Sequence, residues 1–249
     1  MPRFIVFLAG ILLSGVRLAA ADHPITDFGA VAGGVTLNTA AIQATIDAAA
    51  AQGGGRVVIP AGVFRSGSIF LKQGVALHLA AGAVLKGSEN IEDYPKLTTR
   101  IEGHFEPWRM ALVNASGLTG LRITGPGKFD GSGPVYWRAF WQRRKENPKC
   151  TNLEVERPRL MFIERCTDVR IENTALEDSG FWNLHLYRCR DVVVENVRIT
   201  IPSSTPELRG PSTDGIDIDS SQNVTVRRCY ISTHDDNIAL KGSKGPFAD

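Results

Sequence analysis

Short segments in which apolar and polar residues alternate recur along most of the chain beyond residue 55. The first of them are 56–59, 68–71, 75–79 and 83–85, and glycine-containing turns separate them. A period of two is typical of β-strands, and glycine favours the turns between strands. The pattern therefore predicts an all-β protein built from many short strands.

Apolar positions beyond Arg159 repeat at fixed intervals. Two series share spacings of 23, 32 and 22 residues, and a third repeats the first two spacings: Met161, Leu184, Ile216 and Ile238; Ile163, Leu186, Ile218 and Leu240; and Val169, Val192 and Val224. A β-sandwich needs no such period, and the leucine-rich repeat consensus is absent. We therefore expect a right-handed parallel β-helix, in which equivalent side chains of successive coils stack. The long interval indicates an insertion at 203–211, and 131–157 is a larger excursion.

One amphipathic helix is expected from Asn38, a candidate N-cap, to about Gln52. Glycines at 53–55 end it, and one face carries small and apolar residues, namely Ala41, Ile42, Thr45, Ile46 and Ala49. It is the only helix that the pattern predicts convincingly. At this position it would cover the open N-terminal end of the β-helix.

The first 21 residues have the features of a secretory signal peptide. Arg3 precedes an apolar run from Phe4 to Val16, and small residues lead to a predicted cleavage after Ala21. The run is too short to span a bilayer. We therefore expect a secreted or periplasmic protein whose residues 22–249 form a single β-helix domain.

Charge excludes some classes of partner. The predicted leader holds Arg3 and Arg17 and no acidic residue, so 26 basic and 26 acidic residues remain in the mature chain. A neutral chain gives no reason to expect nucleic acid or an anionic membrane as a partner. We expect a monomer.

Four cysteines in an exported chain raise the question of disulfides. Cys166 and Cys189 are 23 residues apart, and each precedes an Asp-Val pair, so we expect them at equivalent positions on adjacent coils. Buried thiols are favoured, and a disulfide is the alternative. No CxxC pair is present, and we expect no metal and no cofactor.

Three aspartates are spaced by one coil. Residues 212–217 and 232–238 align at a spacing of 22, which places Asp214 opposite Asp236 and near Asp235. Stacked strands lie about 4.8 Å apart. Crowding or burial of carboxylates raises the proton affinity of at least one of them, which gives an acid beside a base, as in glycoside hydrolysis. The alternative is that these aspartates only stabilise turns. Because simple alternation points Asp214 inward with Ile216, a catalytic role requires a bend before the strand.

The motifs around these aspartates resemble those of glycoside hydrolase family 28, the polygalacturonase-like enzymes that degrade pectin. Residues 181–185 read Phe-Trp-Asn-Leu-His, 212–215 read Ser-Thr-Asp-Gly, and 234–236 read His-Asp-Asp. They are similar to the family's Phe-Trp-x-x-His, Asn-Thr-Asp-Gly and Gly-Asp-Asp segments. The residues at 27–30, 38–43 and 53–62 are similar to the opening shared by pectin-active β-helix proteins.

The resemblance implies that Asp235 is the general acid, that Asp214 and Asp236 hold and deprotonate the attacking water, and that the anomeric centre is inverted. Inverting hydrolysis generally requires carboxyl groups roughly 6.5–9.5 Å apart. The substrate would be a pectin-type polysaccharide containing uronate. Four nearby residues are candidate substrate contacts, with alternative roles in the core, in a turn or at the surface: Trp182, His185, His234 and Lys241.

The chain also departs from the family pattern. Ser212 replaces the usual Asn, and His234 replaces a common Gly. The family's later Gly-His-Gly and Arg-Ile-Lys segments are absent, so we expect a fragment of a longer gene product that lacks the C-terminal coils. The alternative functions are a calcium-dependent pectate lyase, a noncatalytic glycan-binding β-helix and an inactive fragment.

Overall fold

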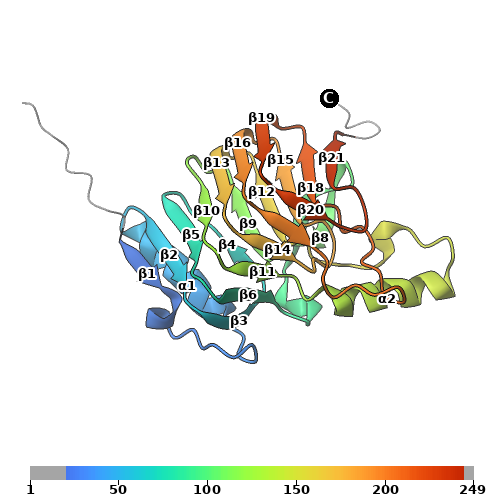
Figure 1. The fold of residues 1–249 in the computed structure, drawn as a ribbon, viewed down its shortest axis with the longest axis horizontal. Coiled ribbons are helices and arrows are strands. Elements are labelled where there is room, and N and C mark those ends of the chain that lie inside the picture. Colours follow the sequence, from blue (N-terminus) through green and yellow to red (C-terminus); the bar gives the residue numbers. More distant parts are fainter. Residues whose placement is uncertain (1–20, 244–249) are drawn as a thin grey trace, which may run out of the picture.

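The computed structural model describes residues 21–243, which wind into a right-handed parallel β-helix with three sheets (Figure 1). The first sheet contains β1 (Asp22–Pro24), β2 (Gly55–Ile59), β5 (Val75–Leu79), β10 (Arg122–Thr124), β13 (Thr167–Glu172), β16 (Arg190–Glu195) and β19 (Gln222–Arg227). The second contains β3 (Gly62–Ser66), β6 (Ala83–Gly87), β11 (Lys128–Asp130), β14 (Ala175–Glu177), β17 (Arg198–Thr200) and β20 (Tyr230–Ser232). The third contains β4 (Ile69–Phe70), β9 (Val113–Ser116), β12 (Met161–Glu164), β15 (Leu184–Tyr187), β18 (Ile216–Asp219) and β21 (Ile238–Lys241).

The strand register confirms the repeat that the sequence predicts. In the third sheet Met161 pairs with Leu184, Leu184 with Ile216, and Ile216 with Ile238. In the first sheet Val192 pairs with both Val169 and Val224. Each coil therefore passes in turn through the third, first and second sheets, and its inward apolar side chains stack on those of the next coil to form the core. The predicted insertion at 203–211 is a loop between β17 and β18.

Helix α1 (Thr39–Ala51) covers the N-terminal end of the β-helix, as expected. Its buried face carries Ile42, Thr45, Ile46 and Ala49. The predicted cap is wrong in detail, because the Asn38 side chain makes no capping hydrogen bond. Its Oδ1 instead accepts from the Val31 amide at 2.7 Å, which ties the preceding loop to the start of the helix.

Two excursions leave the coils. The expectation of a single helix is wrong, since α2 (Gly133–Glu146) lies within the predicted excursion at 131–157. Pro134 lies in the first turn of this helix, and Tyr136, Trp137 and Phe140 bury one face. An antiparallel hairpin of β7 (Lys96–Ile101) and β8 (His104–Arg109) is the second excursion, which the sequence pattern did not indicate. Three short 3-10 helices complete the fold: η1 (Ile25–Phe28), η2 (Ile91–Asp93) and η3 (Asn152–Glu154).

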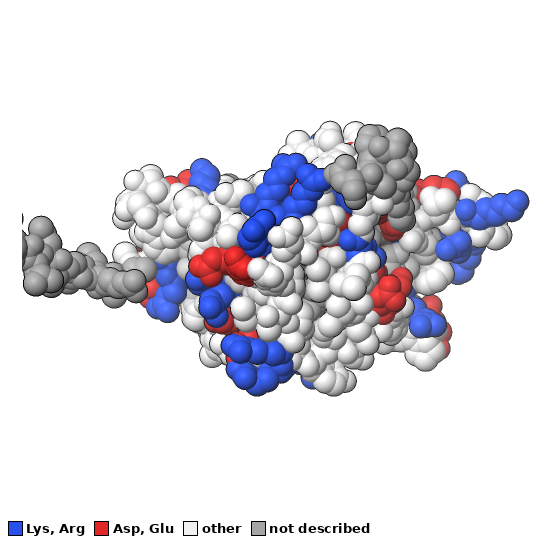
Figure 2. All heavy atoms as spheres, turned by 90° about the horizontal axis from the view of Figure 1, so that it is seen from above, with Lys and Arg blue, Asp and Glu red and all other residues white. Residues whose placement is uncertain are grey.

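Oppositely charged side chains pair between neighbouring coils. Arg122 and Asp168 are 2.7 Å apart, as are Lys128 and Glu177. Figure 2 shows basic and acidic groups close to one another on the face that it displays.

Cys166 and Cys189 lie on adjacent coils, where the Arg190 amide donates to the Cys166 carbonyl, and all four cysteines are free thiols.

Strand β21, in the last coil of the described chain, is more exposed than the coil before it. On β21, Ile238 is 47% and Leu240 83% exposed, whereas Ile216 in the preceding coil is fully buried. The predicted leader, apart from Ala21, lies outside the described residues. None of the helices within residues 21–243 has the length and apolar character needed to cross a bilayer.

Candidate active site

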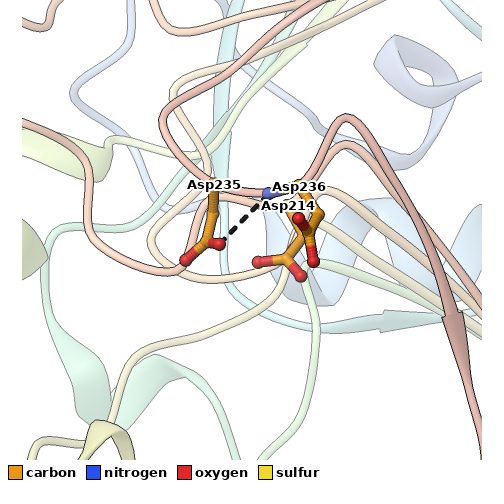
Figure 3. A group of neighbouring side chains, drawn as sticks. All are labelled: Asp214, Asp235 and Asp236. Carbon is orange, nitrogen blue, oxygen red and sulfur yellow. Dashed lines mark hydrogen bonds between the residues drawn. The ribbon is translucent and has the colours of Figure 1, made fainter.

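Asp214, Asp235 and Asp236 form a cluster on two neighbouring coils (Figure 3). Asp214 precedes β18, while Asp235 and Asp236 lie in the turn between β20 and β21. One carboxylate oxygen from each residue lies within 4.8 Å of the others. This is a distance between single oxygens, whereas the roughly 6.5–9.5 Å that is typical of inverting enzymes separates whole carboxyl groups.

A bend before β18 turns Asp214 away from the apolar core. Ser212 adopts a positive φ of 53°, and the Gly215 amide donates to the Asp236 carbonyl at 2.8 Å. Position 215 requires glycine, since a Cβ there would lie 2.4 Å from the Asn237 carbonyl oxygen. The bend that the sequence analysis required is therefore present, and Asp214 reaches Lys241 on the outer face of the third sheet.

Lys241 links two buried carboxyl groups. Its Nζ lies 2.8 Å from Asp214 Oδ2 and 3.0 Å from Asp217 Oδ1, and it stacks on the Trp182 ring at 4.4 Å. Within residues 21–243, neither Asp217 oxygen has a partner that meets hydrogen-bond geometry. Burial opposes the charge on Lys241, but the attraction of Asp217 and Asp214 outweighs it and raises the pKa of the ammonium.

Asp214 and Asp217 differ in protonation state, although burial raises the pKa of both. It raises the pKa of Asp214, and Lys241 partly offsets this rise. It raises the pKa of Asp217 to about 9, and the charge of Asp214 adds to the effect. One ammonium group balances one carboxylate, so at neutral pH Asp214 is the ionised partner and Asp217 holds a proton.

The predicted substrate contacts occupy different environments. Trp182 is almost fully buried beneath Lys241, and the amide of Gly210 donates to Nδ1 of the half-buried His234 at 3.2 Å. Contact of Trp182, His234 or Lys241 with a sugar stays a prediction. His185 was expected at the substrate surface, but the structure places it at 0% exposure.

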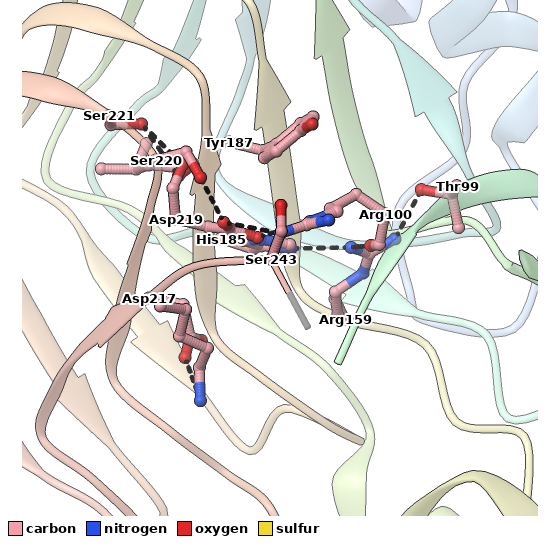
Figure 4. Close-up of polar contacts among 12 residues, drawn as sticks. Thr99, Arg100, Arg159, His185, Tyr187, Asp217, Asp219, Ser220, Ser221 and Ser243 are labelled. Atoms are coloured by element: carbon pink, nitrogen blue, oxygen red, sulfur yellow. Dashed lines mark hydrogen bonds and ion pairs between the residues drawn. The ribbon is translucent and has the colours of Figure 1, made fainter. Parts of the chain in front are cut away.

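His185 belongs to a buried network of charged groups (Figure 4). Its Nδ1 lies 2.8 Å from Arg159 Nη1 and its Nε2 lies 3.3 Å from Asp219 Oδ2. Burial lowers the pKa of His185 to about 3, so the ring is neutral. Because Arg159 only donates, we assign the ring proton to Nε2, facing Asp219.

The same network attaches the hairpin to the third sheet. Arg100 on β7 donates to both oxygens of Asp219, at 2.8 and 3.2 Å, and Arg159 donates to the Arg100 carbonyl at 2.6 Å. Burial would raise the pKa of Asp219, but hydrogen bonds from His185 and Arg100 outweigh it and hold that pKa below its usual value.

Four residues of the site were not predicted from the sequence: Asp217, Asp219, Arg100 and Arg159. A signal for the first two was available. In β18 they alternate with Ile216 and Ile218, and the register pairs them with His185 and Tyr187 on the outer face of the sheet.

Comparison with known proteins places these features in a family. The sequence profile described as glycosyl hydrolases family 28 matches residues 51–245. A "Probable polygalacturonase" of Vitis vinifera is 31% identical over 237 residues, covering 92% of this chain and 46% of its own length. An "Endo-polygalacturonase" of Pectobacterium carotovorum subsp. carotovorum is 30% identical over 189 residues, covering 74% of this chain and 46% of its own length.

A solved structure shares the architecture. The hyperthermoactive exopolygalacturonase of Thermotoga maritima superposes with a TM-score of 0.74 at 27% identity, covering 88% of this chain and 54% of that one. The chain spans about half the length of the curated relatives that it matches. The profile match over most of the chain, together with these relatives, shows that the chain belongs to glycosyl hydrolases family 28.

Proposed function

We propose that the protein hydrolyses glycosidic bonds in a uronate-containing, pectin-type polysaccharide. The observation that carries the proposal is the cluster of Asp214, Asp235 and Asp236 on adjacent coils. The relatives are named as polygalacturonases, which supports the choice of substrate class.

In this mechanism Asp235 protonates the leaving glycosidic oxygen. Asp214 and Asp236 hold the attacking water and accept its proton. A water that makes two hydrogen bonds of about 2.8 Å at a near-tetrahedral angle bridges oxygens about 4.6 Å apart. The separation of up to 4.8 Å in the cluster suits such a bridging water. Attack opposite the leaving group then inverts the anomeric carbon.

The decisive experiment incubates the full-length protein with polygalacturonate. Hydrolysis releases reducing ends without an unsaturated, UV-absorbing product, and NMR of the first product identifies its anomer. Asp235→Asn should abolish most of the release. An unsaturated product that disappears in chelator would instead assign a calcium-dependent lyase, and binding without turnover would assign a noncatalytic protein.

We further propose export and a monomeric state. The sequence of the first 21 residues supports export. N-terminal sequencing of the protein recovered outside the cytoplasm should begin at Asp22, and size-exclusion chromatography should give the mass of a single chain.

A further inference from the structure

A pocket of about 260 Å³ opens beside the aspartate cluster. Trp141 and Arg144 of α2 line one wall, and Arg209 and Ser212 of the loop before β18 line another. Asp235 also lines the pocket, whereas Asp214 and Asp236 do not. The volume is just below the range of roughly 300–1,000 Å³ for small-molecule sites, so it suits one sugar rather than several.

The two arginines that line the pocket have no acidic partner. Within residues 21–243, neither Arg144 nor Arg209 forms an ion pair. Arg144 donates only to the Pro148 carbonyl, at 3.1 Å, and its guanidinium lies 5.5 Å from the Phe140 ring. The neighbouring Arg143 differs, because it pairs with Glu154 at 2.8 Å and does not line the pocket.

A third positive charge lies buried next to the pocket. Arg157 is 0% exposed, and its Nη1 and Nη2 donate to the Pro211 carbonyl at 2.6 Å and to Ser212 Oγ at 3.4 Å. Nη2 also donates to the Asn152 carbonyl at 3.2 Å, and Nε has no hydrogen-bond partner. Among the described residues no carboxylate forms an ion pair with Arg157, although Glu102, Asp214 and Asp235 attract its charge. Burial lowers the pKa of Arg157 to about 9, so it keeps its charge at neutral pH.

Burying the charge of Arg157 is costly, and the nearby Asp214 and Asp235 offset this cost only in part, because its pKa still falls. Arg144 and Arg209, which have no ion-pair partner, add positive potential to the pocket. This arrangement suits an anionic ligand, and a guanidinium matches the geometry of a carboxylate. Trp141 supplies an aromatic wall, and its Nε1 donates a hydrogen bond to the Arg209 carbonyl at 2.6 Å.

We propose that this pocket binds the uronate sugar on the leaving-group side of the bond to be cleaved, with Arg144 and Arg209 contacting its carboxylate. The inference rests on the proposed function, in which Asp235 touches the glycosidic oxygen. The water held by Asp214 and Asp236 attacks from the opposite direction, so the departing sugar extends past Asp235 into the pocket. Arg157 is a positioning residue, which holds the loop at 211–212.

The test compares full-length wild type with the double variant Arg144→Gln/Arg209→Gln and with the control Arg143→Gln. Substrates are oligogalacturonates with free carboxylates and the same oligomers as methyl esters. We expect the double variant to lose roughly tenfold to a hundredfold in kcat/KM on the free acid and much less on the ester. The control should keep the wild-type preference. An unchanged preference in an active double variant would overturn the proposal.

A binding measurement separates this proposal from the proposed function. Digalacturonate binding is followed by calorimetry for all three proteins. If wild type binds but releases no reducing ends, the proposed function fails, and weaker binding by the double variant alone still supports an anion pocket. If the double variant binds digalacturonate as tightly as wild type, the pocket assignment fails whether or not the protein is a hydrolase.

Discussion

The ammonium group of Lys241 lies 2.8 Å from the carboxylate of Asp214, and this contact joins two neighbouring coils at the proposed catalytic site. The same ammonium lies 3.0 Å from Asp217, so two buried carboxyl groups share one positive charge. This sharing keeps Asp214 available as an ionised group although burial favours its protonated form.

Lys241→Met is therefore expected to shift the pH dependence of the reaction. The hydrogen bond from Lys241 lowers the pKa of Asp214, so without it the carboxyl group keeps its proton to higher pH. A charged hydrogen bond worth about 1.5–3 kcal/mol corresponds to about 1–2 pH units. The acidic limb of the kcat/KM profile should move upward by that amount. Lys72→Met, which breaks a surface pair with Asp47, is the control and should leave the limb in place.

Asp217→Asn is expected to preserve or increase stability at neutral pH. The folded protein holds a proton on Asp217 up to about pH 9, whereas the unfolded chain releases it near the ordinary value of 3.8. A raised pKa contributes stability below pH 4 that is lost progressively as the pH rises toward 9. Asparagine does not titrate, so in urea unfolding the variant should gain on wild type with rising pH, by about 4 kcal/mol between pH 4 and pH 7.

Asp168→Asn is a control of opposite sign. Its hydrogen bond with Arg122 holds the pKa of Asp168 below the ordinary value, so its contribution is present at neutral pH and is lost on acidification. If Asp217→Asn instead loses stability at every pH, Asp217 is ionised in the folded protein and the assignment of its proton is wrong.

The coils could be predicted from sequence because inward side chains repeat at the period of the structure. Met161 and Leu184 illustrate this, since their spacing of 23 residues is one full turn and they pair in register. The alignment of Asp214 with Asp236 followed from the same period, and both lie just before strands that pair. What the sequence left open was the bend that turns Asp214 outward, because it depends on the backbone at Ser212.

The excursions could not be predicted in the same way. Arg100 and Asp219 are 119 residues apart, and only the folded hairpin brings them together. His185 was a candidate contact for a sugar carboxylate or a surface residue near the cleft, but the hairpin network covers it. Helix α2 did carry a signal, since Pro134 precedes aromatic residues at 136, 137 and 140 that share a face.

Arg100→Met is expected to destabilise the protein, because it removes a paired cation from a buried network. Asp219 would keep only neutral partners, which are His185 Nε2 at 3.3 Å and the Ser220 hydroxyl at 3.0 Å, and the chain should lose about 3–5 kcal/mol of unfolding free energy. Arg143→Met breaks the half-exposed pair with Glu154 and should cost less than about 1 kcal/mol.

A double variant checks that the loss comes from the unpaired charge. Arg100→Met/Asp219→Leu removes both partners, so its loss should be smaller than the sum of the two single losses in chemical denaturation. Additive losses would mean that Arg100 and Asp219 stabilise the hairpin independently.

Gly215→Ala tests whether close contact between the two coils sets the positions of the aspartates. The added Cβ would lie 2.4 Å from the Asn237 carbonyl oxygen and 2.5 Å from Ile231 Cγ2, so the turn that carries Asp235 and Asp236 must move away from Asp214. A misplacement of about 1 Å can cost roughly a hundredfold in rate, and we expect kcat to fall by that order. Gly242→Ala is the matched control, since its added Cβ meets no heavy atom of residues 21–243 within 4 Å. Thermal unfolding of both variants separates lost alignment from lost folding.

A Gly215→Ala protein that unfolds below the assay temperature gives no kinetic answer, so the comparison is made at a temperature where both variants remain folded. Wild-type kcat in folded Gly215→Ala would show that the aspartates tolerate a shift between the coils, and the proposed water bridge between Asp214 and Asp236 would then be wrong.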